Sequence, residues 1–394
     1  MTEQAKVPAI RFAGFTDPWE QRKASEVFQI VDDRGHPTLP VLSATQNQGM
    51  IYRDDSGRYI GHDESNEIGY KRVLPGDFVV HLRSFQGGFA HSQYEGITSP
   101  AYTVFRAKEP TSHSDRFWKH WFMSEHFIAG LSTVTYGIRD GRSISVDEFM
   151  NTFLAFPAVE EQAAISRLFD YLDDLITLHQ RKYDKLVVFK KSMLEKMFPK
   201  DGESVPEIRF AGFTDPWEQR KLENLASFGG GHTPPMADAG NYVDGKILWI
   251  TSQDVKQHYI ENTTTMISEK GAATLTLYPS DSIVIVARSG ILRHTIPVAK
   301  LRKPATVNQD IKVIQTVDSC DSSWLLQYFI ASNKTLLREY GKTGTTVESI
   351  DFAKMKSTAL MVPYIEEQQA IGSFFSRLDD LITLHQRKRL WFAK

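Results

Sequence analysis

The 394-residue sequence is poor in cysteine, in long apolar runs and in net charge, and each shortage bears on the class of protein. A single cysteine, Cys320, excludes an internal disulfide framework and a zinc site built from cysteines. No run of about eighteen apolar residues is present, so we expect no membrane span. The first residues, MTEQAKVPAI, lack the apolar core of a signal peptide, which predicts a cytoplasmic protein. Basic residues (46) nearly balance acidic ones (48), so total charge gives no indication of a nucleic-acid partner.

What the sequence does contain is an internal duplication. The stretch IRFAGFTDPWEQRK at 10–23 recurs at 208–221, and LDDLITLHQRK at 172–182 recurs at 378–388. Weaker echoes keep the same order, since PGD at 75–77 is matched by PSD at 279–281. The chain is therefore one unit written twice, with constant ends and a rewritten middle. This pattern indicates a common frame that presents two different recognition surfaces.

Both rewritten middles have the pattern of mixed helix and strand. Runs rich in β-branched and aromatic residues predict strands at 78–82, 102–105, 247–251 and 282–287. An aromatic-rich helix is predicted over 116–127 and another over 323–338. We therefore expect an α+β fold.

The closing segment of each copy has the pattern of a long helix. In the first copy it begins after Pro157 with Glu160 and Glu161, as the helix dipole favours, and ends near Pro199. A helix of about 37 residues is a rod of roughly 55 Å. The predicted heptad seam consists of Ile165, Leu168, Leu172, Leu175, His179, Leu186, Phe189 and Met193, with Phe169, Ile176, Tyr183 and Lys190 in the adjacent column.

The second copy keeps this seam through Ile371, Phe374, Leu378, Leu381 and His385. It stops at Lys394, so we expect a short second helix. Two matching helices in one chain predict an antiparallel coiled coil about a pseudo-twofold axis, with His179 near His385.

This arrangement resembles the specificity subunit of type I restriction–modification systems, over essentially the whole chain. The resemblance rests on the doubled RFAGFTDPWEQRK, the helix starts PAVEEQ and PYIEEQ, and the doubled LDDLITLHQRK. It implies two target-recognition domains, at 1–155 and 201–361, which begin with opening segments at 8–23 and 206–221. They alternate with helical spacers at 156–200 and 362–394.

The resemblance further implies a non-catalytic reader of double-stranded DNA. Each domain would read one half of a split, asymmetric target, and the helices would set the gap and dock modification subunits. No cofactor is expected in this chain, because the modification (methyltransferase) subunits would carry the S-adenosylmethionine. Restriction subunits, with endonuclease and translocase activity, would join the same assembly.

Two rival classes stay open on the residues alone: a self-contained DNA methyltransferase or nuclease, and a coiled-coil adaptor that binds only protein. Asp17-Pro18-Trp19 resembles a clipped methyltransferase turn without its second proline, and PGD at 75–77 is better explained as a turn before a strand. The glycine-rich loop at 229–233 lacks the lysine of a phosphate loop, so we expect a flexible start of the second domain. The histidines show no metal-ligand spacing. We predict no catalytic residue and no metal site.

DNA contacts are expected on basic, polar, glycine-containing loops, because cations and hydroxyls bind phosphate and Arg, Asn and Gln read base edges. The candidates are Lys71, Arg72, Arg83, Ser84, Gln86, Arg139, Arg142 and Ser143 in the first domain and Ser252, Gln253, Arg288, Ser289, Arg293, Lys342, Thr343 and Thr345 in the second. Arg83 and Arg288 recur at matched positions, which favours phosphate contact.

A second set of residues is predicted to dock subunits, to anchor the opening segments or to pair the helices. It comprises Phe15, Trp19, Leu172, Leu175, His179, Phe213, Trp217, Leu378, Leu381 and His385. The aromatic members are expected to anchor each opening segment on the helical frame, with Pro18 fixing a turn.

Overall fold

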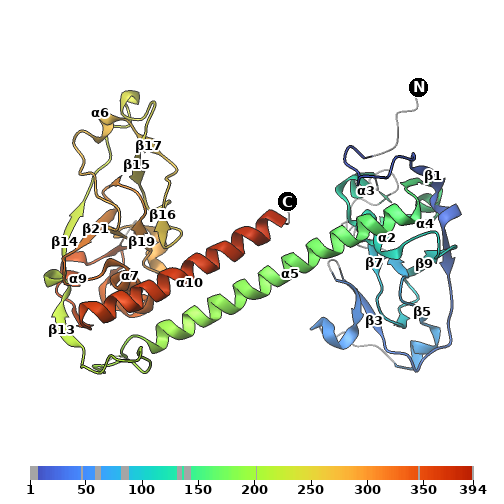
Figure 1. The fold of residues 1–394 in the computed structure, drawn as a ribbon, viewed down its shortest axis with the longest axis horizontal. Helices are drawn as coiled ribbons and strands as arrows, with labels where there is room; N and C mark the ends of the chain where they lie inside the picture. Colours follow the sequence, from blue (N-terminus) through green and yellow to red (C-terminus); the bar gives the residue numbers. More distant parts are fainter. Residues whose placement is uncertain are drawn as a thin grey trace. The chain divides into compact units, whose positions relative to one another are not determined.

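The computed structural model describes residues 8–45, 48–57, 64–80, 88–130, 135–136, 143–200, 202–344 and 347–392. The chain divides into two compact units, Met1–Leu175 and Ile176–Lys394 (Figure 1). Each unit combines β-sheets with helices, which is the α+β fold expected from the sequence. The finer domain boundaries given above stay predictions.

The first unit is built around a four-stranded antiparallel sheet. Its strand order is β2 (Phe28–Val31), β9 (Thr103–Ala107), β6 (Phe78–Val80) and β7 (Phe89–His91). Two-stranded ladders join β3 (Leu42–Thr45) to β4 (Gly49–Tyr52), β5 (Lys71–Val73) to β8 (Gly96–Thr98), and β10 (Thr135–Tyr136) to β11 (Ser143–Ile144). The short helices are α1 (Ala24–Val27), α2 (Asp115–Met123), α3 (Glu125–Gly130) and α4 (Val146–Asn151). The core is aromatic, with Phe28, Phe78, Phe105 and Trp118 fully buried.

The second unit has a larger sheet core. Its five-stranded sheet has the order β14 (Ala226–Gly230), β21 (Ile311–Thr316), β18 (Ile283–Val286), β19 (Val298–Leu301) and β16 (Tyr259–Ile260). A three-stranded sheet contains β17 (Met266–Ile267), β15 (Ile247–Ile250) and β20 (Ala305–Val307). The other elements of this domain are α6 (Glu269–Ala272), α7 (Ser322–Ala331), α8 (Asn333–Tyr340), β22 (Gly341–Lys342), β23 (Ser349–Ile350) and α9 (Phe352–Lys356). Every residue of β18, IVIV, is buried, as in a central strand covered on both faces.

The single aromatic helix predicted in each domain is wrong, because each is two helices. In the first domain Ser124 separates α2 from α3 with an extended backbone (φ −69°, ψ 143°). Its hydroxyl accepts the amide of Phe127 at 3.2 Å and so caps the second helix. In the second domain Ser332 ends α7 just before α8 begins. Helical periodicity continues across both breaks in the sequence, which hid them.

Two long helices form the frame. α5 (Val159–Lys196) has 38 residues and α10 (Ile365–Phe392) has 28. Within the second unit the C-terminal part of α5 runs antiparallel to α10 (Figure 1), since Lys190 Nζ donates to Asp379 Oδ1 at 2.6 Å and His179 Nδ1 lies 2.8 Å from His385 Nδ1. The two histidines are equivalent positions of the two copies. Their contact is the one that antiparallel pairing of identical segments predicts.

The seam of this helix pair differs from the predicted one by a column. The buried and half-buried positions on α5 include Leu172, Ile176, His179, Tyr183, Leu186, Lys190, Met193 and Met197, and those on α10 include Ile371, Phe375, Leu378, Ile382, His385 and Arg389. The placement of Leu381 in the seam is wrong, since its side chain is 45% exposed and Ile382 takes its place. Leu168, Phe169 and Phe189 are exposed as well, while Leu175 is half-buried. Both columns are apolar, so periodicity alone did not choose between them.

A short ladder closes each copy just before its long helix. β1 (Glu20–Lys23) pairs antiparallel with β12 (Phe153–Phe156), and β13 (Glu218–Lys221) pairs in the same way with β24 (Ala359–Val362). The repeated letters EQRK therefore form the first strand of each copy and connect the opening segment to the start of the frame.

Candidate nucleic-acid interface

In the second domain, the ends of neighbouring strands bring three loops side by side. The carbonyl of Ile250, at the end of β15, accepts the amide of Asn308 at 2.9 Å. The amide of Ala287, just after β18, donates to the carbonyl of Asp310 at 2.8 Å. The loops that begin at residues 251, 308 and 287 therefore lie next to one another.

The hairpin β22–β23 extends this series. Arg288 forms an isolated β-bridge with Ser349, and Ser349 pairs with Lys342 across the hairpin. We call the segments 251–253, 308–310, 287–289, 348–350 and 341–343 the loop row. It contains Ser252, Gln253, Arg288, Ser289, Lys342 and Thr343 of the predicted DNA contacts, which lie far apart in the sequence. Their roles as contacts stay predictions.

The cations at this site differ in how they are held. Arg293 Nε donates to Glu348, and Lys342 Nζ lies 2.7 Å from Asp351 Oδ2. The hydrogen bond from Arg293 lowers the pKa of the Glu348 carboxyl, which stays charged. Arg288 is exposed and has no salt-bridge partner within the part of the chain that the structure describes. It is therefore the cation of the loop row most available to a phosphate.

The predicted contacts of the first domain are less well placed. Lys71 Nζ donates to the carbonyl of Tyr102 at 2.8 Å, and Arg72 forms ion pairs with Glu95 and Asp33. A phosphate would have to displace these partners. Arg83, Ser84, Gln86, Arg139 and Arg142, together with Thr345 of the second domain, lie outside the described residues. Ser143 belongs to β11, but its side chain is outside them too.

A contact that sequence reasoning missed ties each opening segment to its long helix. Arg11 donates to Glu161 through Nε at 2.8 Å and Nη2 at 2.6 Å. Arg209 makes the same two bonds to Glu367, at 2.8 and 2.6 Å. Both carboxylates are 2% exposed. The repeated arginine and the repeated EEQ could have indicated these pairs. They were missed because the partners are 150 and 158 residues apart in the sequence.

The glutamine that follows in each EEQ holds the recognition domain by its backbone. Gln162 Oε1 accepts the amide of Ser114, and Gln368 Oε1 accepts the amide of Asp321. These amides belong to the N-caps of α2 and α7. Because the frame binds a backbone amide, the side chain at that position can differ between the copies. It is a serine in the first copy (Ser114) and an aspartate in the second (Asp321).

Of the aromatic residues in the opening segments, Trp217 contacts the frame and Trp19 contacts α2 of the recognition domain. Trp217 is 3% exposed and its Nε1 donates to Glu367 Oε2 at 3.1 Å. Trp19 is half-buried, with its ring 6.3 Å from that of Phe117 and 6.0 Å from that of Trp121. Phe15 and Phe213 are also half-buried.

Two motifs considered as possible functional sites, PGD at 75–77 and the glycine-rich segment at 229–233, have structural roles. Asp77 of PGD is 2% exposed, accepts the amide of Leu74 and pairs with Arg106 at 2.7 Å, so it stabilises a turn. Burial raises the pKa of its carboxyl. The expectation of a flexible glycine loop is wrong, because Gly229 and Gly230 belong to strand β14. A Cβ on Gly229 would meet the hydroxyl of Tyr278, so the glycine is required by close packing.

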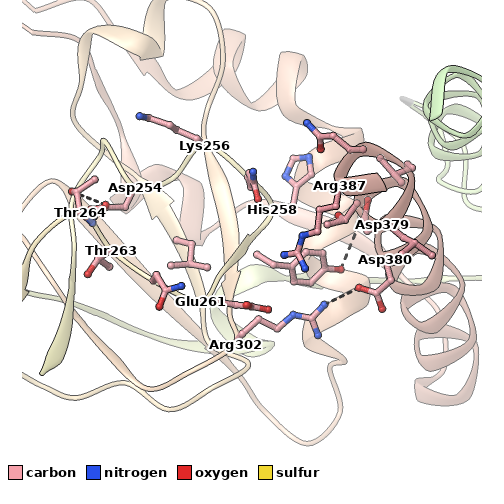
Figure 2. A pocket seen from close by; sticks show the side chains of 18 of the residues that line it. Asp254, Lys256, His258, Glu261, Thr263, Thr264, Arg302, Asp379, Asp380 and Arg387 are labelled. Atoms are coloured by element: carbon pink, nitrogen blue, oxygen red, sulfur yellow. Dashed lines mark hydrogen bonds and ion pairs between the residues drawn. The ribbon is translucent and has the colours of Figure 1, made fainter. Parts of the chain in front are cut away.

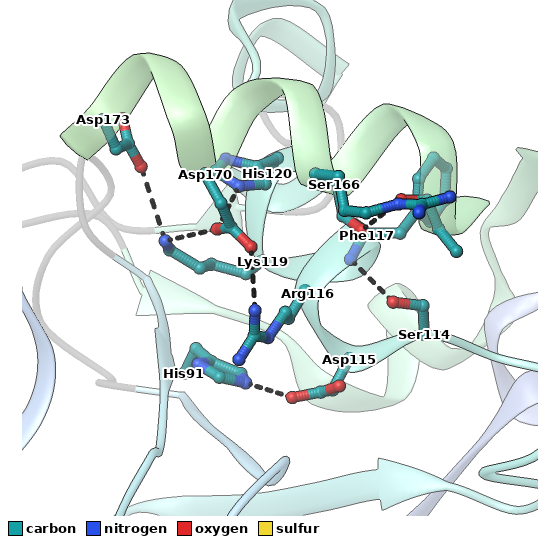
Figure 3. A network of polar contacts seen from close by, with 12 residues as sticks. His91, Ser114, Asp115, Arg116, Phe117, Lys119, His120, Ser166, Asp170 and Asp173 are labelled. Atoms are coloured by element: carbon teal, nitrogen blue, oxygen red, sulfur yellow. Dashed lines mark hydrogen bonds and ion pairs between the residues drawn. The ribbon is translucent and has the colours of Figure 1, made fainter. Parts of the chain in front are cut away.

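A polar network joins the first domain to the N-terminal part of α5 (Figure 3). Asp170 accepts from His120 at 3.0 Å, and Lys119 lies 3.5 Å from Asp170 and 3.4 Å from Asp173. Burial would raise the pKa of Asp170, but the hydrogen bond from His120 and the nearby cations outweigh it and lower the pKa. His120, Asp170 and Asp173 are metal-ligand types within reach of one another, yet the ammonium of Lys119 already compensates both carboxylates.

A groove of about 980 Å³ lies between the second domain and α10 (Figure 2). One wall is the segment 253–264 with Arg302, and the other is the 379–387 stretch of α10. At its base Arg302 stacks 4.2 Å above the ring of Tyr259 and lies 3.3 Å from Asp380.

Buried contacts also link this domain to the frame. Tyr259 hydroxyl lies 3.1 Å from Ser376 Oγ, and Gln327 Nε2 donates to Asp379 at 3.2 Å. Burial raises the pKa of Tyr259 to about 12.

Residues 214–390 match the family model for the type I restriction modification DNA specificity domain. The sequence is 31% identical over 166 residues to the type I restriction enzyme EcoR124I/EcoR124II specificity subunit of Escherichia coli, covering 42% of this chain and 41% of that subunit. It is 30% identical over 174 residues to the type I restriction enzyme MjaIX specificity subunit of Methanocaldococcus jannaschii, covering 42% and 38%. These matches span about two fifths of the length of each relative.

Among solved structures, the crystal structure of the type I restriction–modification system S subunit from M. genitalium is similar over 98% of this chain and 96% of that chain. The TM-score is 0.63 at 10% identity, a likeness of fold. No helix in the described ranges has the length and apolarity to cross a membrane. Residues 214–390 thus match a type I restriction modification DNA specificity domain, and the chain is similar to specificity subunits of type I restriction enzymes.

Proposed function

We propose that this chain is the sequence-specific DNA-recognition subunit of a type I restriction–modification complex. Each recognition domain reads one half of a bipartite, asymmetric target, and the helices set the gap. The single observation that carries the proposal is the loop row, which gathers polar and basic loops at one edge of the second domain. Hydroxyl, amide and guanidinium groups together bind phosphates and base edges.

The long helix α5 offers a surface for the modification subunits. Besides the seam, α5 exposes Leu168, Tyr171 and Leu178. Steps of three and seven residues place them on one face of the helix, where they form a stripe. An exposed apolar stripe on a helix suits the apolar face of a partner helix.

Chemistry is assigned to the partners in this proposal. The modification subunits carry the S-adenosylmethionine and transfer the methyl group, the restriction subunits cleave, and the complex works in the cytoplasm. A self-contained enzyme is less well supported, because the motifs that suggested catalysis hold turns and domain contacts together. An adaptor that binds only proteins would not require the polar and basic groups that the loop row brings together.

The test is to map the bases methylated in DNA by the complex of this chain with its modification subunits. We expect a target of two short read stretches separated by a gap of fixed length. The purified chain alone, given labelled methyl donor and the same DNA, should transfer no label. Methyl transfer by the chain alone, or a continuous target, would contradict the proposal.

Arg288 gives a sharper test of the loop row. Replacing Arg288 with Ala should weaken binding to all sequences alike and make the salt dependence of log K shallower by about one phosphate contact. Binding is measured by titration at several salt concentrations, with Lys334→Ala, an exposed cation on α8, as control. A loss confined to one base position would make Arg288 a base reader instead. The same change at Arg83 tests the predicted counterpart in the first domain.

A further inference from the structure

The groove beside α10 is continuous with the loop row. Gln253 belongs to the segment 251–253 of the row and also lines the groove. The segment that follows, through His258 and Tyr259, forms one wall of the groove (Figure 2). A nucleic-acid strand held along the loop row therefore meets the groove at this end.

Three of the four carboxylates that line the groove have hydrogen-bond or ion-pair partners. Asp254 accepts from the amides and hydroxyls of Thr251 and Thr264. Asp379 is paired with Lys190, and Asp380 with Arg302.

The groove also carries two cations outside these ion pairs. Arg387 and Lys256 have no salt-bridge partner within the described ranges, and Asp254 and Glu261 are the carboxylates of the lining outside the ion pairs above. His258 adds no charge near neutral pH, because burial lowers its pKa. Arg387 and Lys256 are thus the cations of the lining that a phosphate can bind without breaking an ion pair.

Arg387 belongs to the constant part of the chain. It lies in LDDLITLHQRK, whose first copy places Arg181 at the same position. The seam does not use this position, since Arg181 and Arg387 are both exposed. Figure 2 shows Arg387 projecting from α10 toward the wall of the second domain. A cation that is identical in both copies, and that helix packing does not need, suits a ligand that is the same whatever sequence is read.

We propose that the groove holds the sugar–phosphate backbone of DNA where it leaves the half-site read by the second domain, with Arg387 as the phosphate contact. The proposal rests on the proposed function and adds a DNA contact made by the constant helix. The backbone carries the same charge at every base pair, so the same arginine serves any target. Lys256, on the opposite wall, supports the same strand.

The first test compares Arg387→Ala with Arg377→Ala, an exposed arginine on α10 that does not line the groove. The complex with modification subunits is titrated with its mapped target duplex. Between 50 and 200 mM salt, the loss of affinity should be about threefold smaller for Arg387→Ala than for wild type, which corresponds to one phosphate contact. Arg377→Ala should match wild type, and the methylated sequence should be unchanged in both variants. Equal slopes for Arg387→Ala and Arg377→Ala would overturn the proposal.

The second test neutralises the DNA instead. Single methylphosphonate linkages are placed along both strands across the inner edge of the second half-site. At one or two of these linkages, the methylphosphonate should weaken binding by wild type. At the same linkages it should not weaken binding by Arg387→Ala any further. If no position is coupled to Arg387, the groove does not hold DNA. If Arg387→Ala keeps its salt slope but loses assembly with modification subunits, the occupant is a protein segment. Wild type that fails to prefer its target over a scrambled duplex would instead refute the proposed function.

Discussion

Equivalent faces of the two long helices hold their recognition domains by different chemistry. In the first unit Asp173 of α5 faces Lys119 at 3.4 Å, in an ion pair whose carboxylate is 56% exposed (Figure 3). In the second unit Asp379, its counterpart 206 residues later, is buried: Gln327 of the recognition domain donates to it at 3.2 Å, and Lys190 of α5 pairs with it at 2.6 Å. The same repeated aspartate is a solvated contact in one copy and a buried one in the other.

The contacts that both copies share are of another kind. The Arg11–Glu161 and Arg209–Glu367 pairs join constant residues to each other. Gln162 and Gln368 bind backbone amides of the rewritten domains. The comparison teaches that a constant frame holds divergent domains through groups that do not depend on their side chains. Side-chain contacts are left free to change.

The largest expected effect distinguishes the buried pair from the exposed one. Lys190→Ala leaves Asp379 buried without its cation, which should reduce the free energy of unfolding of the second unit by about 3–5 kcal/mol. Lys119→Ala in the first unit should cost less than about 1 kcal/mol, because its pair is solvated. Urea titration, read by hydrogen exchange in α10 and in α2, measures each loss separately. Similar losses at both sites would show that the difference in burial has no energetic meaning.

A somewhat smaller effect is expected from the contacts that the copies share. Arg11→Ala should destabilise the first unit, by less than Lys190→Ala destabilises the second, because Glu161 is buried and loses a two-bond charged partner. Arg209→Ala should cost the second unit less, since Glu367 keeps the indole donor of Trp217. The same hydrogen-exchange measurement reports both. A larger loss for Arg209→Ala would mean that the tryptophan bond does not compensate.

The smallest effect concerns the histidine contact of the helix pair. Burial lowers the pKa of both His179 and His385, and the charges of Lys182 and Lys388 lower both further. The unfolded chain therefore takes up protons first as the pH falls below about 6.5. Stability of the second unit should be full above that pH and decline as the pH falls toward 5.

His179→Asn combined with His385→Asn should flatten this decline in thermal unfolding. His258, whose pKa burial also lowers, should retain part of it. A double variant with the full decline of wild type would assign the effect to other groups.

Much of the frame was predictable because it is periodic and repeated. The limits of α5, the antiparallel pairing and the contact of His179 with His385 follow from two matching heptad segments in one chain. The choice of Ile382 over Leu381 does not, because both columns are apolar and only the partner helix decides which is covered. The breaks at Ser124 and Ser332 were hidden by continuous apolar periodicity.

The candidate site was predictable as a set of loops but not as an arrangement. Polar and basic composition indicated Gln253, Arg288 and Lys342, while strand order and long-range pairing decide that their segments share one edge. The Arg11–Glu161 pair was missed because charge pairing across 150 residues leaves no local pattern. Arg387 was overlooked for a different reason. Solvated arginines are common on helices, and the sequence does not show that this one lines a groove.

The central claim is that one constant frame carries two independent readers, and an exchange of domains tests it most directly. Residues 24–155 are replaced by the first recognition domain of another type I specificity subunit, with 8–23 and the helices kept. The graft should dock, because Gln162 binds a backbone amide and the Arg11–Glu161 pair lies within the constant part. Mapping the methylated bases should then show one half of the target changed, with the other half unchanged. A change in both halves would contradict the account, because the two domains would not read independently.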